Sequence, residues 1–151
     1  MAWIPALLWM GVIAAESSDL FSSAHTGKLL YSLLSAVWGS MDLPRFLVWH
    51  SFLRKAGHVL GYSLLNLLFF RAWRETLPSP LQSRWMLRWA NAALLGTILV
   101  AALDEWHQSY LPARTGTVRD VALDTCAGLA VQFILWRALA TRRATGDHAV
   151  R

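Results

Sequence analysis

Apolar residues occur in long runs along this chain, separated by shorter segments that carry charge, glycine and proline. A helix that crosses a bilayer needs about 20 mostly apolar residues, and the runs suit that length, except that the first is short and the second long enough to tilt. The pattern predicts an all-α, polytopic membrane protein of about four transmembrane helices, with residues 1–151 as a single domain. We place these helices at about residues 3–15, 46–73, 85–103 and 118–139.

The segment between the first two apolar runs, residues 17–44, has a different character. Its leucines are mixed with serine, histidine and lysine, as in a helix that lies flat in the membrane interface. We therefore predict one or two amphipathic interfacial helices here. The preceding residues 1–15 end in alanines before Glu16, as a signal peptide would, but they lack a positively charged first region. We therefore keep them as a membrane helix.

The composition agrees with a lipid environment. Hydrophobic residues make up 56% of the chain and charged residues 15%, whereas soluble domains hold roughly 25% charged residues. The net charge of +5 does not indicate nucleic-acid binding, because the basic residues flank apolar runs and form no patch on a soluble domain. Cys126 is the only cysteine, and there is no nucleotide fingerprint or zinc motif. We predict no cofactor and no metal.

The distribution of charge predicts an orientation in the membrane. Arginine and lysine are retained on the cytoplasmic side, and with a cytoplasmic N-terminus the inner segments hold more of these residues than the outer ones. Acidic residues crowd the outer segments. We therefore predict cytoplasmic N- and C-termini and a polar site that faces the outside.

Polar and ionisable residues gather at the predicted outer helix ends. A charge at membrane depth costs roughly 2.5 to 3.5 kcal/mol on insertion scales, so these groups should face the bundle interior and find partners. Residues four apart share a helix face, and the turn at residues 111–116 would hang Arg114 over the resulting pocket. The aligned sets are Arg54, His58 and Tyr62 beside Lys55; Asp104 and Gln108 beside Glu105 and His107; and Asp120 and Asp124.

Less specific interpretations of these residues remain open. Arg54 or Lys55 paired with a carboxylate can form a structural ion-pair network, and His107 can simply lie at the water interface. Asp104 and His107, with His58 nearby, have donor atoms that suit a metal. The chain has no HExxH-type spacing, which is why a metal is not predicted.

Three motifs follow one another between Arg54 and Gly128, over about half of the chain. They read Arg54-Lys55-x-x-His58-x-x-x-Tyr62-x-x-Leu65, then Asp104-Glu105-x-x-Gln108-x-x-x-Pro112-x-Arg114, then Asp120-x-x-x-Asp124-x-x-x-Gly128. In this order the chain resembles the VanZ-like family of small bacterial membrane proteins, named for a protein associated with resistance to the glycopeptide teicoplanin. The family pattern often has asparagine where this chain has Asp124. The resemblance implies a multi-pass protein of the bacterial inner membrane with a role in the cell envelope and in teicoplanin tolerance.

The first functional hypothesis is an intramembrane hydrolase or transferase that acts on an anionic envelope amphiphile, either a polyprenyl-linked lipid or a phospholipid. Histidine and carboxylates can share proton transfer near neutral pH, and arginine offers a fork for a phosphate. The predicted catalytic residues are His58, Asp104, Glu105 and Asp120. The predicted substrate-binding residues are Arg54, Lys55, Tyr62, Gln108, Arg114 and Asp124.

The alternatives need no catalysis. The same pocket suits a binder that recognises a lipid head group or a glycopeptide, or a small transport element. A further hypothesis makes the polar residues an internal network that orients the helices of a structural subunit in a membrane complex. Membrane lipid is the expected partner in each case, and nucleic acid in none.

Overall fold

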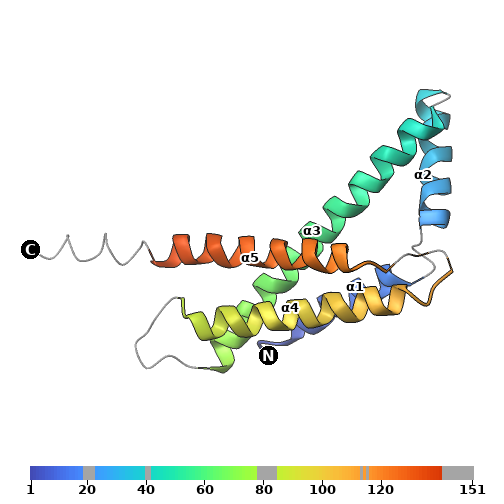
Figure 1. Cartoon of the computed structure of the whole chain (residues 1–151). Helices are drawn as coiled ribbons and strands as arrows, with labels where there is room; N and C mark the ends of the chain where they lie inside the picture. Colours follow the sequence, from blue (N-terminus) through green and yellow to red (C-terminus); the bar gives the residue numbers. More distant parts are fainter. Residues whose placement is uncertain (19–22, 40–41, 78–84, 113, 115, 141–151) are drawn as a thin grey trace, which may run out of the picture.

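The structure is a computed structural model that describes residues 1–18, 23–39, 42–77, 85–112, 114 and 116–140. Within these residues the chain forms five α-helices and no strand (Figure 1), which confirms the all-α prediction. Each predicted apolar run contains one helix, and the segment between the first two runs contains another. The helices are α1 (Ile4–Ser17), α2 (Ser23–Trp38), α3 (Leu43–Thr76), α4 (Leu87–Gln108) and α5 (Val118–Ala140).

Three of the helices form a central bundle. α4 and α5 lie side by side and run in opposite directions, and α3 crosses both obliquely (Figure 1). α1 packs against α3 and α4. Among the described helices α2 contacts only α3, and with the N-terminal half of α3 it projects from the bundle as an arm (Figure 1).

Local sequence explains where several helices begin. A proline stands in the first turn of α1 and of α3, where its missing N–H removes no helical hydrogen bond. Before α5, the Thr117 hydroxyl accepts a hydrogen bond from the backbone N–H of Asp120 (3.2 Å) and donates one to the Asp120 carboxylate (2.9 Å). This reciprocal arrangement resembles a capping box and fixes the first turn of α5.

The connection between α4 and α5 depends on Gly116. A Cβ at this position would lie 2.0 Å from the carbonyl oxygen of Glu105, a separation that no side chain can adopt. Glycine therefore lets the connection pass directly over the last turn of α4. This close approach sets the start of α5 beside Glu105.

On α4, small residues line the contacts with the neighbouring helices, whereas several leucines face outward. Ala93 and Ala101 of α4 are fully buried, while Leu95 and Leu99 of the same helix are 66% and 61% exposed. A helix of a soluble protein turns its leucines toward the core, and helices in lipid meet through small residues. The surface of the bundle is therefore suited to lipid.

The prediction of four apolar spans is wrong in its count. Among the described residues, two helices are long and apolar enough to cross a membrane, Leu87–Gln108 and Val118–Leu139. Only 33% of the most apolar 18 residues of the first helix is buried, and 22% of those of the second. α1 has 14 residues, or about 21 Å at about 1.5 Å per residue, against a hydrocarbon core of about 30 Å. α3 is long enough at 34 residues, but polar residues such as Arg54, Lys55 and Asn66 lower its mean hydropathy.

The arm corresponds to part of the predicted interfacial segment. α2 packs on α3 through the ring of Tyr31, whose centroid lies 5.1 Å from that of Phe46 in an edge-on arrangement. Leu29, Leu33 and Val37 of α2 are exposed on the other side. A helix in this segment is confirmed, whereas its amphipathic character and its position at the membrane interface stay predictions. Residues 19–22 and 40–41 lie outside the described part of the chain.

Candidate functional site

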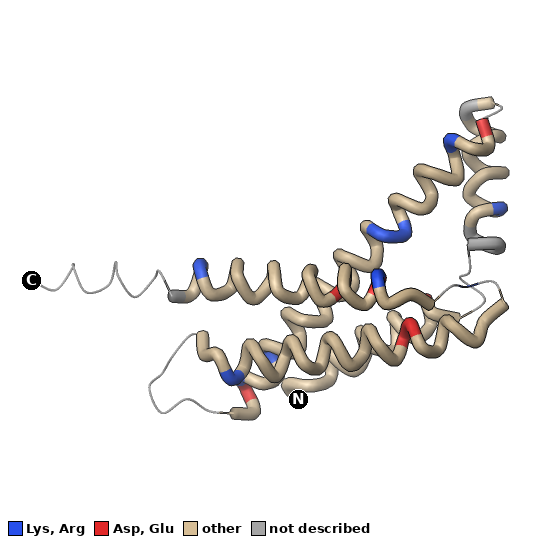
Figure 2. Tube along the Cα trace, in the orientation of Figure 1, with Lys and Arg blue, Asp and Glu red and all other residues tan. Residues whose placement is uncertain are grey.

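Polar side chains from three helices come together where α3 crosses α4 and α5. Figure 2 shows acidic positions of α4 and α5 gathered at this crossing. We call this group the polar cluster; it consists of His58 and Tyr62 from α3, Asp104, Glu105 and Gln108 from α4, and Asp124 from α5. All six belong to the site predicted from the sequence, and their roles stay predictions.

The Asp104 carboxylate is held by two donors. Its Oδ2 accepts a hydrogen bond from the hydroxyl of Tyr62 on α3 (3.0 Å) and another from the Nε2 of Gln108 one turn further along α4 (3.0 Å). All three side chains are buried. A buried hydrogen-bonded network of this kind fixes both the orientation of the carboxylate and the crossing of α3 and α4.

His58 and Asp124 face each other across α3 and α5. The Nδ1 of His58 lies 3.6 Å from the Oδ2 of Asp124, and the Asp124 side chain is 0% exposed. Within the described residues, neither carboxylate oxygen of Asp124 nor the Nδ1 of His58 has a hydrogen-bond partner. Because a buried carboxylate without donors is unfavourable, this pair is suited to hold a further group.

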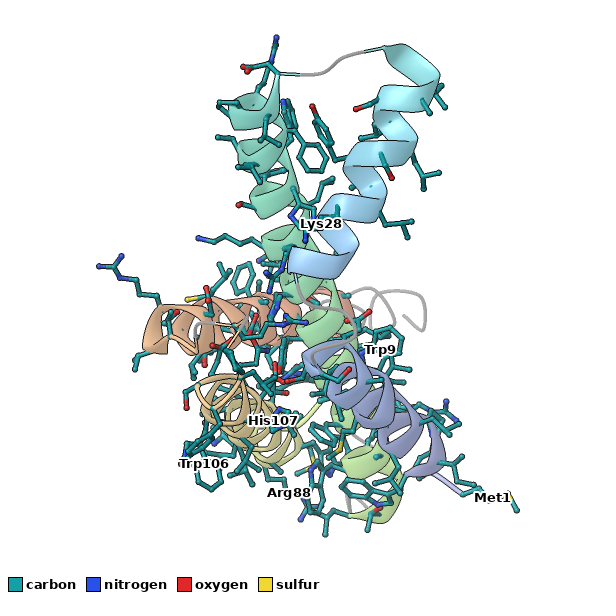
Figure 3. The ribbon with its side chains drawn as sticks, turned by 90° about the vertical axis from the view of Figure 1, so that its right-hand side faces the viewer. Met1, Trp9, Lys28, Arg88, Trp106 and His107 are labelled. Atoms are coloured by element: carbon teal, nitrogen blue, oxygen red, sulfur yellow. The ribbon has the colours of Figure 1, made fainter. Side chains whose placement is uncertain are left out.

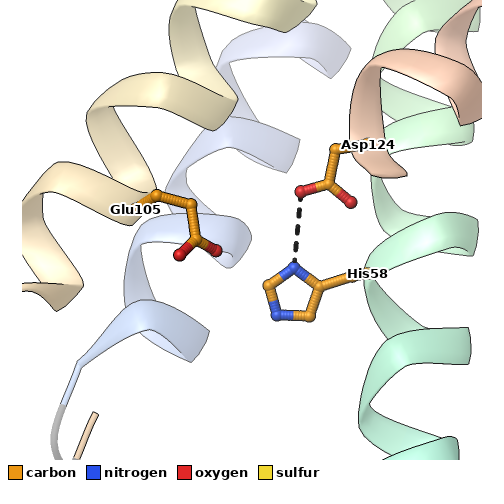
Figure 4. Close-up of side chains that lie close together, drawn as sticks. All are labelled: His58, Glu105 and Asp124. Atoms are coloured by element: carbon orange, nitrogen blue, oxygen red, sulfur yellow. Dashed lines mark ion pairs between the residues drawn. The ribbon is translucent and has the colours of Figure 1, made fainter. Parts of the chain in front are cut away.

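Glu105 points to a different side of α4 from Asp104. Its Oε2 accepts a hydrogen bond from the backbone N–H of Thr117 (2.7 Å), which ties the end of α4 to the start of α5. A carboxylate oxygen of Glu105 lies within 4.8 Å of ligand atoms of both His58 and Asp124 (Figure 4). Glu105 therefore belongs with that pair, while Asp120 bonds to Thr117 at the start of α5.

Of the three basic residues predicted to bind substrate, Arg114 is buried against α1, whereas Arg54 and Lys55 lie on α3. Arg114 is buried, and its guanidinium donates hydrogen bonds to the backbone carbonyls of Glu16 (2.5 Å) and Ser18 (3.2 Å) at the C-terminal end of α1. A cation at this end of a helix is favourable because the last carbonyls carry partial negative charge. Arg54 is half-buried and Lys55 exposed on α3, and neither lines the pocket described next.

A small pocket opens beside the polar cluster. It has a volume of about 30 Å³, room for one or two water-sized groups. Most of its walls are polar or glycine. Its lining residues are Ile13, Glu16, Ser17, Gly57, His58, Gly61, Tyr62, Asp104, Gln108 and Arg114.

An open groove of about 370 Å³ lies next to this pocket, between α1 and α4. Its walls are mostly apolar and comprise Met10, Ile13, Ala14, Val100 and Leu103, with Ser17, Asp104 and His107 as its polar residues. Figure 3 shows His107 on the α1 side of α4 and Trp106 on the outer side, and the Nδ1 of His107 lies 3.2 Å from the Ser17 hydroxyl. Ile13, Ser17 and Asp104 are walls of both the groove and the pocket.

The sequence profile of the VanZ/LLP1 family matches residues 2–140, nearly the whole chain. The chain belongs to the VanZ/LLP1 family. The family resemblance carried by the three motifs is thereby confirmed. No curated protein and no solved structure matches the chain. Membership of the VanZ/LLP1 family and the two outward-facing apolar helices identify a membrane protein.

This VanZ/LLP1 chain also has a second buried polar network, which the sequence analysis did not identify. The side-chain amide of Asn66 on α3 donates to the hydroxyl of Thr97 on α4 (3.1 Å) and accepts from the Nε2 of Gln132 on α5 (2.5 Å). Gly128 allows this contact, since a Cβ there would lie 3.2 Å from the Asn66 amide. The signal was present in the spacing, because Asn66 lies four residues after Tyr62 and Gln132 eight after Asp124.

Proposed function

We propose that this VanZ/LLP1 protein binds an anionic amphiphile of the cell envelope, a polyprenyl-linked lipid or a phospholipid, and carries out acid–base chemistry on its head group. The observation that carries this proposal is that the apolar groove and the polar pocket share three lining residues, Ile13, Ser17 and Asp104. A molecule with an apolar chain and a polar head matches that pair of adjacent spaces. The groove volume of about 370 Å³ also falls within the range of about 300 to 1,000 Å³ usual for ligand sites.

The groove gives the chain of such a lipid a route from the bilayer. It is open between α1 and α4, and α4 presents exposed leucines on its outer face. Apolar surface is favourable to bury at roughly 25 cal/mol per Å², so an acyl or prenyl chain gains by lying against Met10, Val100 and Leu103. Its head group then meets Ser17, Asp104 and His107.

The polar cluster supplies groups for proton transfer. In this proposal His58 is the general acid or base, and the buried Asp124 orients its ring from 3.6 Å. Asp104 is held in place by Tyr62 and Gln108 and faces the head group. Arg54, Lys55 and Arg114 provide positive charge around the site for an anionic head group.

The proposal includes a position in the membrane. We infer that α4 and α5 cross the bilayer and that α3 turns its polar face toward the bundle. The termini are cytoplasmic, and the polar cluster faces the outside of the bacterial inner membrane. The name of the VanZ family motivates the corresponding physiological proposal, a change in tolerance to the glycopeptide teicoplanin when the gene is deleted.

Native mass spectrometry of the detergent-purified protein tests lipid binding. The parent should retain a phosphate-bearing lipid, and Gly61→Leu should lose it, because Gly61 lines the pocket and a Cβ there meets nothing within 4 Å, so the variant can fold. Gly11→Leu is the matched control, since a Cβ at Gly11 is equally unobstructed and Gly11 lines neither space. A parent without bound lipid, or equal retention by Gly61→Leu, contradicts the proposal.

A second comparison separates an enzyme from a non-catalytic binder. His58→Gln should retain the lipid but not convert it, whereas the parent should release a chemically altered head group on incubation with envelope lipids. If the parent retains the lipid and leaves it unchanged, the protein is a binder or a transport element and the catalytic part of the proposal fails.

A further inference from the structure

We propose that His58, Glu105 and Asp124 bind a divalent transition-metal ion of the Zn²⁺ or Mn²⁺ class. One imidazole and two carboxylates form a donor set that suits these ions, whereas Ca²⁺ and Mg²⁺ prefer oxygen ligands alone. The three residues come from α3, α4 and α5 and surround one point between these helices (Figure 4).

The separations of the donor atoms are close to those of a metal site. One ligand atom from each of the three residues lies within 4.8 Å of the other two. Ligands at about 2.1 Å from a tetrahedral ion are about 3.4 Å apart. The Nδ1 of His58 and the Oδ2 of Asp124 are already near this separation at 3.6 Å, and we expect metal binding to draw the Glu105 carboxylate closer to them.

The burial of Asp124 points independently to a ligand. Its side chain is 0% exposed, it is directed into the cluster (Figure 4), and among the described residues neither of its oxygens has a hydrogen-bond donor. The carboxylate of Glu105 is buried as well. Two buried carboxylates beside one imidazole are unfavourable unless positive charge lies between them. A protonated imidazole supplies one unit of charge, whereas a divalent cation balances both carboxylates.

The surroundings of Glu105 resemble the outer shell of a metal site. The backbone N–H of Thr117 donates to its Oε2 at 2.7 Å, a contact that orients a ligating carboxylate. Three protein ligands leave at least one coordination position open. Because His58 is also a wall of the small pocket, that position lies on the side from which a head group or a water molecule would approach.

His58 and Asp124 also belong to the proposed function. With the ion bound, His58 would be a ligand, and a water molecule on the metal would supply the acid–base chemistry in its place. Metal binding itself does not depend on lipid binding. The test is equilibration of the detergent-purified protein with Zn²⁺, removal of free ion, and measurement of bound metal by elemental mass spectrometry. The parent should retain about one equivalent. The Glu105→Gln, Asp124→Asn double variant keeps the side-chain shapes and should bind at least about ten times more weakly. Asp120→Asn and His107→Gln, which change similar groups outside the triad, should bind as the parent does.

The outcomes are distinguishable. A parent without bound metal, or one that binds no more tightly than the double variant, overturns the inference, while lipid retention in the same samples is judged separately. If circular dichroism shows that the double variant does not fold, the test is the visible spectrum of bound Co²⁺, compared between the parent and His58→Gln. A parent that lacks the visible absorption of four- or five-coordinate Co²⁺ overturns the inference, and so does a spectrum that is the same in His58→Gln.

Discussion

Replacement of Tyr62 by phenylalanine tests the hydrogen bond that joins α3 to α4 at the polar cluster. The change removes one hydroxyl and keeps the ring, which is buried and lies 6.1 Å from the ring of His58. The lost bond is the 3.0 Å contact to the Oδ2 of Asp104. Asp104 keeps its bond from Gln108, so its carboxylate is left with one donor in place of two.

The structure sets the size of the expected effect. A hydrogen bond to a charged group contributes about 1.5 to 3 kcal/mol in proteins, and bonds between membrane helices contribute about 0.6 kcal/mol on average and about 1.7 at most. The bond here is buried and charged but not the only one to Asp104. We therefore expect Tyr62→Phe to lower the free energy of unfolding by about 1 to 2 kcal/mol.

The assay is equilibrium unfolding in mixed micelles, followed by the fluorescence of the nine tryptophans. Tyr110→Phe is the matched control, because Tyr110 is exposed and should change the free energy of unfolding by no more than about 0.5 kcal/mol. A double-mutant cycle of Tyr62→Phe with Asp104→Ala, which removes the acceptor, should give a coupling energy of about 1 kcal/mol. Equal stability of Tyr62→Phe and the parent, or zero coupling, would refute the assigned hydrogen bond.

Three further predictions concern stability. Gly116→Ala should lower the free energy of unfolding by about 2 kcal/mol or more, because its Cβ would lie 2.0 Å from the Glu105 carbonyl oxygen; Gly57→Ala, whose Cβ meets nothing within 4 Å, should cause no loss in the same unfolding assay. Asn66→Ala should lower it by about 1 to 3 kcal/mol, since Thr97 and Gln132 lose their shared partner, and a variant as stable as the parent would contradict the network. Arg114→Gln should weaken the attachment of α1, because the hydrogen bonds from Arg114 to the carbonyls of Glu16 and Ser18 are lost. Amide hydrogen exchange should become faster in α1 and stay unchanged in α5. An equal change in both helices would contradict this.

Helical periodicity made much of the site predictable. Residues four apart on one helix share a face, which is why the spacing of His58 and Tyr62, and of Asp104 and Gln108, anticipated the side on which each lies. The stripe could have been followed one turn further on α3, to Asn66. The predicted site contained mostly charged residues, so the neutral network in the bundle interior was not anticipated.

Contacts that depend on tertiary packing could not be predicted in the same way. Asp104 and Glu105 are adjacent, and neighbouring residues of a helix point about 100° apart, so one faces Tyr62 and the other faces Thr117. Which neighbour each would meet depends on where α3 and α5 lie. Likewise the bonds of Arg114 to the end of α1 follow from the packing of α1.

The number of spans was misjudged because apolar runs were counted without weighing the polar residues inside them. Residues 46–73 do lie in one helix, but Arg54, Lys55 and Asn66 lower its mean hydropathy below that of α4 and α5. The first run is helical but has only 14 residues. The apolar pattern predicted where helices form. Whether a helix can cross the bilayer depends in addition on its length and on the polar residues within it.

The central claim is that the groove and the pocket hold one amphiphile, and blocking the groove tests it most directly. Val100→Trp fills the groove from α4, whereas Leu99→Trp places the same side chain on the exposed outer face of that helix. Val100→Trp should lose the lipid that the parent retains through detergent purification, as should the pocket variant Gly61→Leu. Leu99→Trp should keep it, and the two tryptophan variants should have the same thermal stability. Retention of the same lipid by Val100→Trp and the parent would contradict the account.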